Sequence, residues 1–230
     1  MTTLYIANKN YSSWSLRPWL LMQMLEIPFE EKLVPLIEGG CWDEYRHFSP
    51  NGRVPCLHDD GHVIWESIAI AEYLAEQYPA VWPQDADARA WARCAAAEMH
   101  AGFTALRGEC PMSCGVLVNR HAISPALQHD LERIDELWNE GLRCFGGPFL
   151  ASDAFCAADA FFAPVAFRIQ TYRLPLGAFA MAYAQRLLDL EPMREWYSAA
   201  LEEPWRELSH DCEIEASGVV TEDLRAPVPD

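Results

Sequence analysis

Basic side chains are scarce in this sequence of 230 residues: 17 lysines and arginines stand against 34 aspartates and glutamates. The formal net charge at pH 7 is therefore -17. A strongly negative chain repels phosphate backbones and anionic lipid headgroups. This charge balance argues against nucleic acid and against a membrane surface as binding partners.

Long apolar runs are also missing. No stretch reaches the roughly 18 uninterrupted apolar residues that a membrane-spanning helix requires. The first seven residues have no basic segment followed by an apolar run, so they do not have the pattern of a secretory signal. We therefore expect a cytoplasmic protein, whose 51% of hydrophobic residues is ample for a packed core.

The eight cysteines lack the spacing of a metal site. The closest pair, Cys110 and Cys114, has no second Cys or His pair at the spacing that zinc ligands show. Disulfides are not expected in a reducing compartment. The sequence thus predicts scattered, reduced thiols and no bound metal.

The first 36 residues predict a strand, a loop, a helix and a second strand. Residues 4–7 favour a strand, and the polar stretch 8–13 suits a loop. Ser15 is the expected N-cap of a helix in which apolar residues recur every three or four positions until Ile27. Residues 29–36 alternate enough to form the next strand, parallel to the first through a right-handed crossover.

The following segment predicts a β-hairpin and a helix. Residues 54–58 and 62–65 favour strands, and Asp59-Asp60-Gly61 between them is a tight-turn signal. Ser67 begins an apolar helix that Pro79 ends. The order of elements up to residue 79 is therefore βαβ and then ββα.

The chain is expected to divide at residues 80–85, where prolines and aspartates interrupt the periodic pattern. This gives a domain at 1–79, a linker at 80–85, an all-helical domain at 86–212 and a loosely held tail at 213–230. The remaining expected elements are a short helix at 43–48 within an irregular connection at 39–51, and helices at 88–106, 125–142, 159–172, 179–190 and after Pro192.

The order βαβ then ββα, with a proline opening the third strand, is typical of thioredoxin-like folds. The N-terminal domain resembles that of the cytosolic glutathione S-transferases through three motifs: Ser12-Ser13-Trp14-Ser15, Arg53-Val54-Pro55 and Trp65-Glu66-Ser67-Ile68-Ala69-Ile70. The segment 155–164, with Asp159, resembles the family's capping motif for a buried helix. The resemblance spans residues 4 to about 205. It implies an α/β thioredoxin-like domain, an all-α helical bundle and a homodimer.

Within that family the likeness is to the serine-type, bacterial and distantly zeta-like members. Ser12 matches the catalytic serine, with Ser13 as the other candidate. A hydroxyl can donate a hydrogen bond to the sulfur of glutathione, whose thiol has an ordinary pKa of about 8.5, while the positive end of the first helix favours the thiolate. Trp14 stands where the zeta-like pattern has cysteine, so the isomerase activity is not carried over. The first cysteine is Cys41, which disfavours disulfide exchange.

The resemblance implies glutathione as co-substrate. The peptide between Val54 and Pro55 is expected to be cis and to present the Val54 backbone to the cysteinyl part of glutathione. Glu66 would receive the ammonium group of the γ-glutamyl end, and Ser67 with its amide would receive the carboxylate. Arg53 is a candidate contact for the glycyl end.

The second substrate is expected between the domains, against four side chains: Tyr11, Trp14, Met99 and Phe103. Such side chains suit an apolar electrophile, and they suit a plain core equally well. No role is assigned to three polar residues of the helical domain: His100, Arg107 and Arg168.

The implied reaction joins the thiolate of reduced glutathione to an apolar electrophile. Three alternatives remain open. One is a glutathione-dependent peroxidase or isomerase, and another is a non-catalytic protein that binds hydrophobic ligands. The third is a structural or interaction module with the shape of a transferase.

Overall fold

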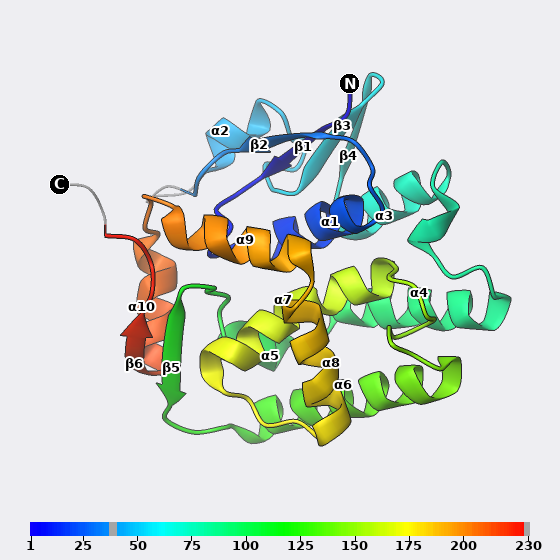
Figure 1. Cartoon of the computed structure of the whole chain (residues 1–230). Coiled ribbons are helices and arrows are strands. Elements are labelled where there is room, and N and C mark those ends of the chain that lie inside the picture. Colours follow the sequence, from blue (N-terminus) through cyan, green and yellow to red (C-terminus); the bar gives the residue numbers. More distant parts are fainter. Residues whose placement is uncertain (37–40, 228–230) are drawn as a thin grey trace.

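Four short strands form a mixed sheet at one edge of the molecule (Figure 1). The computed structural model describes residues 1–36 and 41–227. The strand order is β2-β1-β3-β4, with the bounds Glu30–Leu33, Thr3–Ile6, Cys56–Asp59 and His62–Trp65. β1 pairs parallel with β2 and antiparallel with β3, and β3 pairs antiparallel with β4. This arrangement confirms the predicted thioredoxin-like topology.

Local sequence signals explain the connections of this sheet. The crossover between β1 and β2 is α1 (Ser13–Met24). In the turn between β3 and β4, Asp60 and Gly61 have φ angles of 45° and 82°, the left-handed conformations that a two-residue hairpin turn requires. The peptide between Val54 and Pro55 is cis, as predicted.

The N-cap of α1 differs from the prediction. Ser12, not Ser15, caps the helix, and its side-chain oxygen accepts a hydrogen bond from the Ser15 amide at 3.2 Å. The Ser15 hydroxyl oxygen instead accepts a hydrogen bond from the amide of Ala7 at 3.1 Å. Ser15 therefore ties the helix to the end of β1, which sequence periodicity does not reveal.

The other helices of the N-terminal part follow the sequence signals. The short helix predicted at 43–48 is present as α2 (Trp42–Arg46), although Gly39 and Gly40 of the same connection lie outside the described residues. α3 (Ser67–Ala75) begins at the predicted residue. A 3-10 turn, η1 (Pro79–Val81), leads away from it.

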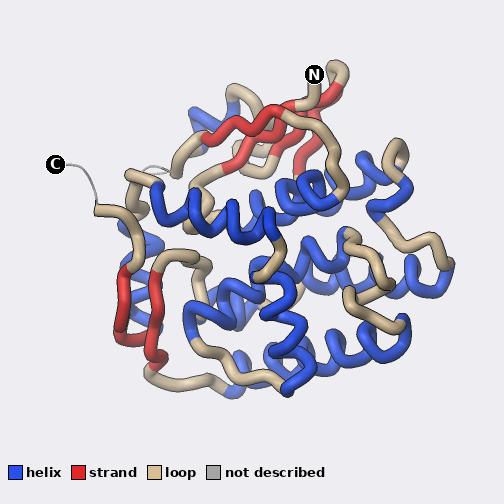
Figure 2. The backbone as a smooth tube through the Cα atoms, viewed as in Figure 1, coloured by secondary structure: helices blue, strands red, loops and turns tan. Residues whose placement is uncertain are grey.

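The second part of the chain is built around α7 (Ala157–Tyr172), which is buried along almost its whole length. Figure 2 shows the other helices surrounding it, with α1 and α9 between it and the sheet. Their bounds are Ala86–Ala101 for α4, Thr104–Glu109 for α5, Pro125–Phe145 for α6, Ala178–Leu188 for α8 and Glu191–Glu202 for α9. The prediction of a core helix at 159–172 is confirmed.

One predicted helix is divided in two. The sequence indicated a single helix over 88–106, but α4 ends at Ala101 and α5 begins at Thr104. Between them, Phe103 adopts a left-handed conformation with φ of 56°. Gly102, in an extended conformation, is the C-cap of α4, and Phe103 is the N-cap of α5, so the helical hydrogen-bond ladder is interrupted at these two residues.

Asp159 caps α7 more completely than the motif implies. Its Oδ2 accepts the Cys156 amide at 2.9 Å, and its Oδ1 accepts both the Leu150 amide at 2.9 Å and the Tyr183 hydroxyl at 2.7 Å. The carboxylate is completely buried. It therefore joins the loop before α7, the first turn of α7 and α8.

The expectation of a loosely held tail at 213–230 is wrong for the described residues up to 227. Residues of this segment complete α10 (Leu208–Ser217) and form β6 (Gly218–Asp223). β6 pairs antiparallel with β5 (Val116–Arg120) in a small second sheet (Figure 1). The pairing joins positions about 100 residues apart in sequence, so no local turn signal in the sequence predicts it.

Candidate functional site

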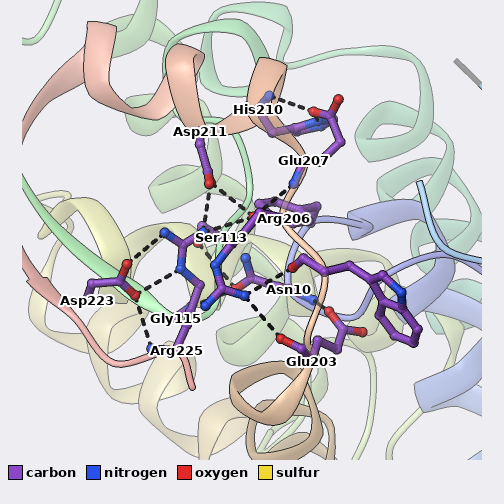
Figure 3. Close-up of polar contacts among 12 residues, drawn as sticks. Asn10, Ser113, Gly115, Glu203, Arg206, Glu207, His210, Asp211, Asp223 and Arg225 are labelled. Carbon is purple, nitrogen blue, oxygen red and sulfur yellow. Dashed lines mark hydrogen bonds and ion pairs between the residues drawn. The ribbon is translucent and has the colours of Figure 1, made fainter. Parts of the chain in front are cut away.

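The loop between β1 and α1 is held by residues from distant parts of the chain (Figure 3). The Glu203 carboxylate accepts hydrogen bonds from the amides of Lys9 at 2.5 Å and Asn10 at 3.1 Å. The Asn10 Oδ1 accepts the amides of Cys114 at 3.0 Å and Gly115 at 2.9 Å. These bonds fix the backbone immediately before Ser12 and Ser13. Burial raises the pKa of Glu203 to about 7.

Tyr11 belongs to this C-terminal network. Its hydroxyl donates to Asp211 at 3.0 Å and accepts from Arg225 at 2.9 Å. Arg225 also pairs with Asp223 of β6 at 2.8 Å. Tyr11 thus anchors the loop to the C-terminal segment. These contacts do not involve Trp14, with which Tyr11 was predicted to line the second-substrate pocket.

The two serines make different contacts. Ser12 is the N-cap of α1 and donates its hydroxyl proton to the Ser15 oxygen at 2.7 Å. Ser13 lies in the first turn of α1, where its oxygen accepts a hydrogen bond from Nη2 of Arg168, in α7, at 3.5 Å. The Ser12 hydroxyl is therefore engaged within the turn, whereas the Ser13 hydroxyl keeps its proton for another acceptor.

Glu66 has an unusual backbone for a residue other than glycine. Its φ is 70° at the N-cap of α3, a conformation that costs about 1–3 kcal/mol and concentrates at functional sites. Its Oε1 accepts a hydrogen bond from the Asn51 side chain at 3.1 Å. The Asn51 Oδ1 in turn accepts the Arg53 amide at 3.1 Å. Asn51 thus connects the Glu66 carboxylate with the segment leading to the cis proline.

His100 of α4 joins the two halves of the Glu66-Ser67 motif to the helical part. Its Nδ1 lies 3.4 Å from the Ser67 hydroxyl, and its Nε2 lies 3.9 Å from the Glu66 carboxylate. The imidazole also packs edge-on against Trp14, with ring centroids 5.3 Å apart. Burial lowers the pKa of His100, and the positive charge of Arg17 lowers it further, so the ring is neutral at pH 7.

Trp14 lies among positive charges. The guanidinium of Arg17 stands 4.2 Å from the centroid of the indole, and that of Arg107 stands 4.6 Å from it. Arg17 also lies 5.0 Å from the ring of Phe161 and is completely buried. The surroundings of Trp14 are therefore both aromatic and cationic, where the sequence indicated an apolar pocket.

The predicted site residues fall into distinct groups. His100 of α4 contacts Trp14, which follows Ser12 and Ser13 at the start of α1, and it lies beside Glu66 and Ser67 at the start of α3. Arg168 of α7 contacts Ser13. Val54 and Pro55 lead into β3 of the same sheet, and Arg53 is exposed. Of the remaining pocket candidates, Met99 is fully buried and Phe103 is nearly so, with its ring against Phe162.

The structure brings five further residues to this site, to which the sequence assigned no role: Arg17, Asn51, His100, Arg107 and Arg168. Arg17 carried a usable signal, because a charged residue between Leu16 and Pro18 interrupts a helix that is otherwise apolar. It also lies one helical turn after Ser13. The others come from separate elements, and no local pattern relates them to the serines.

The described residues contain no group of three or more His, Cys, Asp or Glu side chains that could hold a metal ion. The eight cysteines all lie in the described ranges, and none of them forms a disulfide. Within the same ranges, no helix is both long enough and apolar enough to cross a membrane.

Comparison with known proteins agrees with this geometry. The sequence model of the family "Glutathione S-transferase, N-terminal domain" matches residues 11–77. A probable maleylacetoacetate isomerase 2 of Drosophila melanogaster is 29% identical over 182 residues, which cover 76% of this chain and 78% of that protein. The glutathione S-transferase GstA of Escherichia coli O157:H7 is 28% identical over 174 residues, covering 71% and 80%.

Solved structures show the same fold. A glutathione transferase homolog from Burkholderia gl BGR1, with bound glutathione, superposes with a TM-score of 0.62 at 24% identity, over 86% of this chain and 97% of that one. The matched motifs, the relatives and the two-part architecture agree. Residues 11–77 match the N-terminal domain of the glutathione S-transferase family, and the chain as a whole has the glutathione S-transferase fold.

Proposed function

We propose that this protein is a glutathione S-transferase, which joins the thiolate of reduced glutathione to an electrophilic carbon. The observation that carries the proposal is that His100 packs against Trp14, next to Ser13, and also lies beside Glu66 and Ser67, so that the start of α1 and the start of α3 meet. The match of residues 11–77 to the N-terminal domain of the family supports it. In this proposal, the domain at 1–79 binds glutathione and the domain at 86–212 contributes the second-substrate side.

The γ-glutamyl end of glutathione would lie at the start of α3. Glu66 has a half-exposed carboxylate that can receive the ammonium group. The Ser67 hydroxyl and the first amides of α3 can receive the carboxylate, because amide N–H groups at a helix N-terminus favour an anion. The backbone of Val54, before the cis proline, would pair with the cysteinyl part.

We assign the activating hydrogen bond to Ser13, with Ser12 as the structural cap. Ser12 donates to Ser15 within the turn, while Ser13 accepts from a positively charged guanidinium and can donate its own proton to sulfur. A hydrogen bond to the thiolate favours the charged form and lowers the pKa of the thiol. The thiol proton goes to solvent, the C–S bond forms, and the leaving group departs with its electron pair.

A glutathione-dependent isomerase is the second candidate, because a relative named as a probable maleylacetoacetate isomerase is 29% identical over 76% of this chain. Trp14 occupies the position at which the zeta-like pattern has cysteine. An isomerase would return glutathione unchanged, whereas a transferase consumes it. Measuring the loss of free thiol during turnover of each substrate in a panel therefore separates the two.

The test is a comparison of Ser13→Ala with Ser12→Ala. Calorimetry should show glutathione binding in both variants, because neither hydroxyl holds the γ-glutamyl end. Conjugation of a chromogenic aryl halide should fall about 100-fold in Ser13→Ala, as expected for the loss of a preorganised hydrogen bond to a developing charge. Ser12→Ala should chiefly lower the melting temperature. Unchanged turnover in Ser13→Ala would refute the assignment.

A further inference from the structure

We propose that the second substrate carries a carboxylate, held at the junction of the two domains by Arg17, Arg107 and Arg168. We call these three residues the arginine cluster. The inference rests on the proposed function and replaces the purely apolar electrophile that the sequence indicated. Each member comes from a different helix: Arg17 from α1, Arg107 from α5 and Arg168 from α7.

The strongest evidence for this site is the side chain of Arg17, which is completely buried and has no hydrogen-bond partner for any of its three nitrogens among the described residues. Nη1 of Arg107 is also buried without a partner. A guanidinium has five donors and stays charged in proteins. Buried charges are ordinarily paired, so an unpaired one indicates that a partner is missing.

No described acidic side chain supplies that partner. None forms an ion pair or hydrogen bond with Arg17, Arg107 or Arg168, in residues 1–36 or 41–227. Asp130 exerts a favourable charge effect on Arg107, but its Oδ2 accepts the Leu106 amide. The Glu66 carboxylate contacts Asn51 and His100 instead of the arginines. The cluster therefore has an excess of positive charge that the chain itself leaves uncompensated.

The positive charges within the arginine cluster also repel one another. Burial lowers the pKa of Arg17 well below its ordinary value, and the charges of Arg107 and Arg168 lower it further. Contacts with the rings of Trp14 and Phe161 offset part of this cost, because aromatic faces attract cations. A bound anion would attract the three guanidinium groups and offset the rest of the repulsion between them. Anion binding would therefore stabilise the folded protein.

The position of the cluster identifies which anion fits. Arg168 contacts Ser13, the proposed thiolate donor, and Arg17 and Arg107 both lie against the neighbouring Trp14. A carboxylate bound there places the rest of the molecule beside the sulfur. The γ-glutamyl carboxylate of glutathione is assigned to Ser67, and the glycyl carboxylate to the side of Arg53. The free position therefore belongs to the second substrate.

Trp14 controls access to this position. Its side chain is half-buried and covers Arg17, which has no exposed surface of its own. An incoming carboxylate can reach Arg17 only when the indole moves aside. Binding must therefore change the environment of Trp14, and the change in fluorescence on binding must be reduced in Trp14→Phe.

The test uses two aryl halides that differ in charge at one group, 4-chloro-3-nitrobenzoate and 4-chloro-3-nitrobenzamide. Each kcat/KM is divided by the rate constant of the uncatalysed reaction with glutathione. The wild-type protein should prefer the carboxylate by about tenfold or more, as one charge-assisted hydrogen bond allows. Arg17→Met should bring the ratio close to one. Equal use of both compounds by the wild type would overturn the proposal.

A binding measurement without glutathione separates this proposal from the proposed function. Added 3-nitrobenzoate should raise the melting temperature of the wild type, 3-nitrobenzamide should not, and Arg17→Met should lose the effect. If the wild type does not respond to 3-nitrobenzoate, the carboxylate site is wrong even where conjugation is observed. If the response is present and no electrophile is turned over, the site stands and the transferase assignment fails.

Glutathione itself is the other possible source of the anion. The control replaces it with γ-glutamylcysteine, which lacks the glycyl carboxylate. If Arg17→Met raises KM for glutathione and leaves KM for γ-glutamylcysteine unchanged, the cluster binds the glycyl end, and the proposal is overturned. Equal KM values in variant and wild type for both thiols support it.

Discussion

Arg168 of α7 donates a hydrogen bond to the hydroxyl of Ser13 in α1, across 3.5 Å. The contact joins the helical part of the chain to the first turn of the helix that follows the serine loop. The Arg168 side chain is buried, and its position is held by a second hydrogen bond, from Nε to the Cys110 carbonyl at 2.8 Å. It is therefore a positioning residue for Ser13.

Replacing Arg168 should move the pH dependence of catalysis. In Arg168→Met, the Ser13 hydroxyl loses its donor and the nearby positive charge, so the bound thiol becomes harder to ionise. We expect kcat/KM for conjugation to fall about tenfold at pH 7, and its increase with pH, as the bound thiol ionises, to be shifted to higher pH. Arg168→Lys should recover part of the activity. Arg143→Met, on the exposed last turn of α6, is the control and should change neither quantity.

Glu66→Gln should weaken glutathione binding. The amide keeps the size of the side chain but loses the charge that would pair with the ammonium group. Hydrogen bonds to charged groups contribute about 1.5–3 kcal/mol, so the dissociation constant should rise about 10- to 100-fold in calorimetry. Glu76→Gln, at the other end of α3, should bind as the wild type does. An unaltered dissociation constant in Glu66→Gln would exclude Glu66 from the site.

Glu203 should make stability depend on pH. Burial raises its pKa in the folded state from the ordinary 4.5 to about 7. Between these values the folded protein binds more protons than the unfolded chain, so the free energy of unfolding falls as pH rises. Glu203→Gln removes this contribution. The difference in unfolding free energy, wild type minus variant, should therefore decrease from about pH 4.5 to pH 7 and level off above.

Denaturant unfolding at several pH values measures that difference. Glu202→Gln, one residue earlier and exposed, is the matched control and should follow the wild type. A difference that stayed constant across the range, or that increased with pH, would show that Glu203 has no raised pKa.

Asp159→Asn should destabilise the fold strongly. The aspartate accepts three hydrogen bonds, two of them at Oδ1, in a site without solvent exposure. Asparagine has one acceptor oxygen and places an NH2 group against a donor, so at least one buried donor loses its partner. We expect a loss of about 3 kcal/mol in the free energy of unfolding. Asp153→Asn, which is exposed, should cost almost nothing; equal losses would contradict the capping account.

The sequence predicted those parts of the fold that depend on neighbouring residues. The hairpin between β3 and β4 follows from Asp59-Asp60-Gly61, whereas the cis peptide before Pro55 was expected from the resemblance to a known fold. The start of α3 at Ser67 was also predicted, although Glu66 is the N-cap and makes no side-chain capping hydrogen bond. These signals are local, so they can be interpreted without knowing how distant segments pack.

The missed features all depend on long-range packing. β6 pairs with β5 only because the chain returns past the helical part. The arginine cluster combines positions 17, 107 and 168, which share no spacing or motif. The sequence predicted the serines and the Glu66-Ser67 pair as site residues, but the positive charge around Trp14 became evident only when the packing of α1, α5 and α7 was known.

The central claim is that Ser13 keeps the sulfur of bound glutathione ionised. The most direct measurement is a pH titration of the ultraviolet absorbance of the thiolate in the complex of glutathione with the wild type, Ser12→Ala and Ser13→Ala. The account predicts a thiol pKa below the ordinary 8.5 or so in the wild type and in Ser12→Ala, and a return to about that value in Ser13→Ala. The same lowered pKa in Ser13→Ala would contradict it.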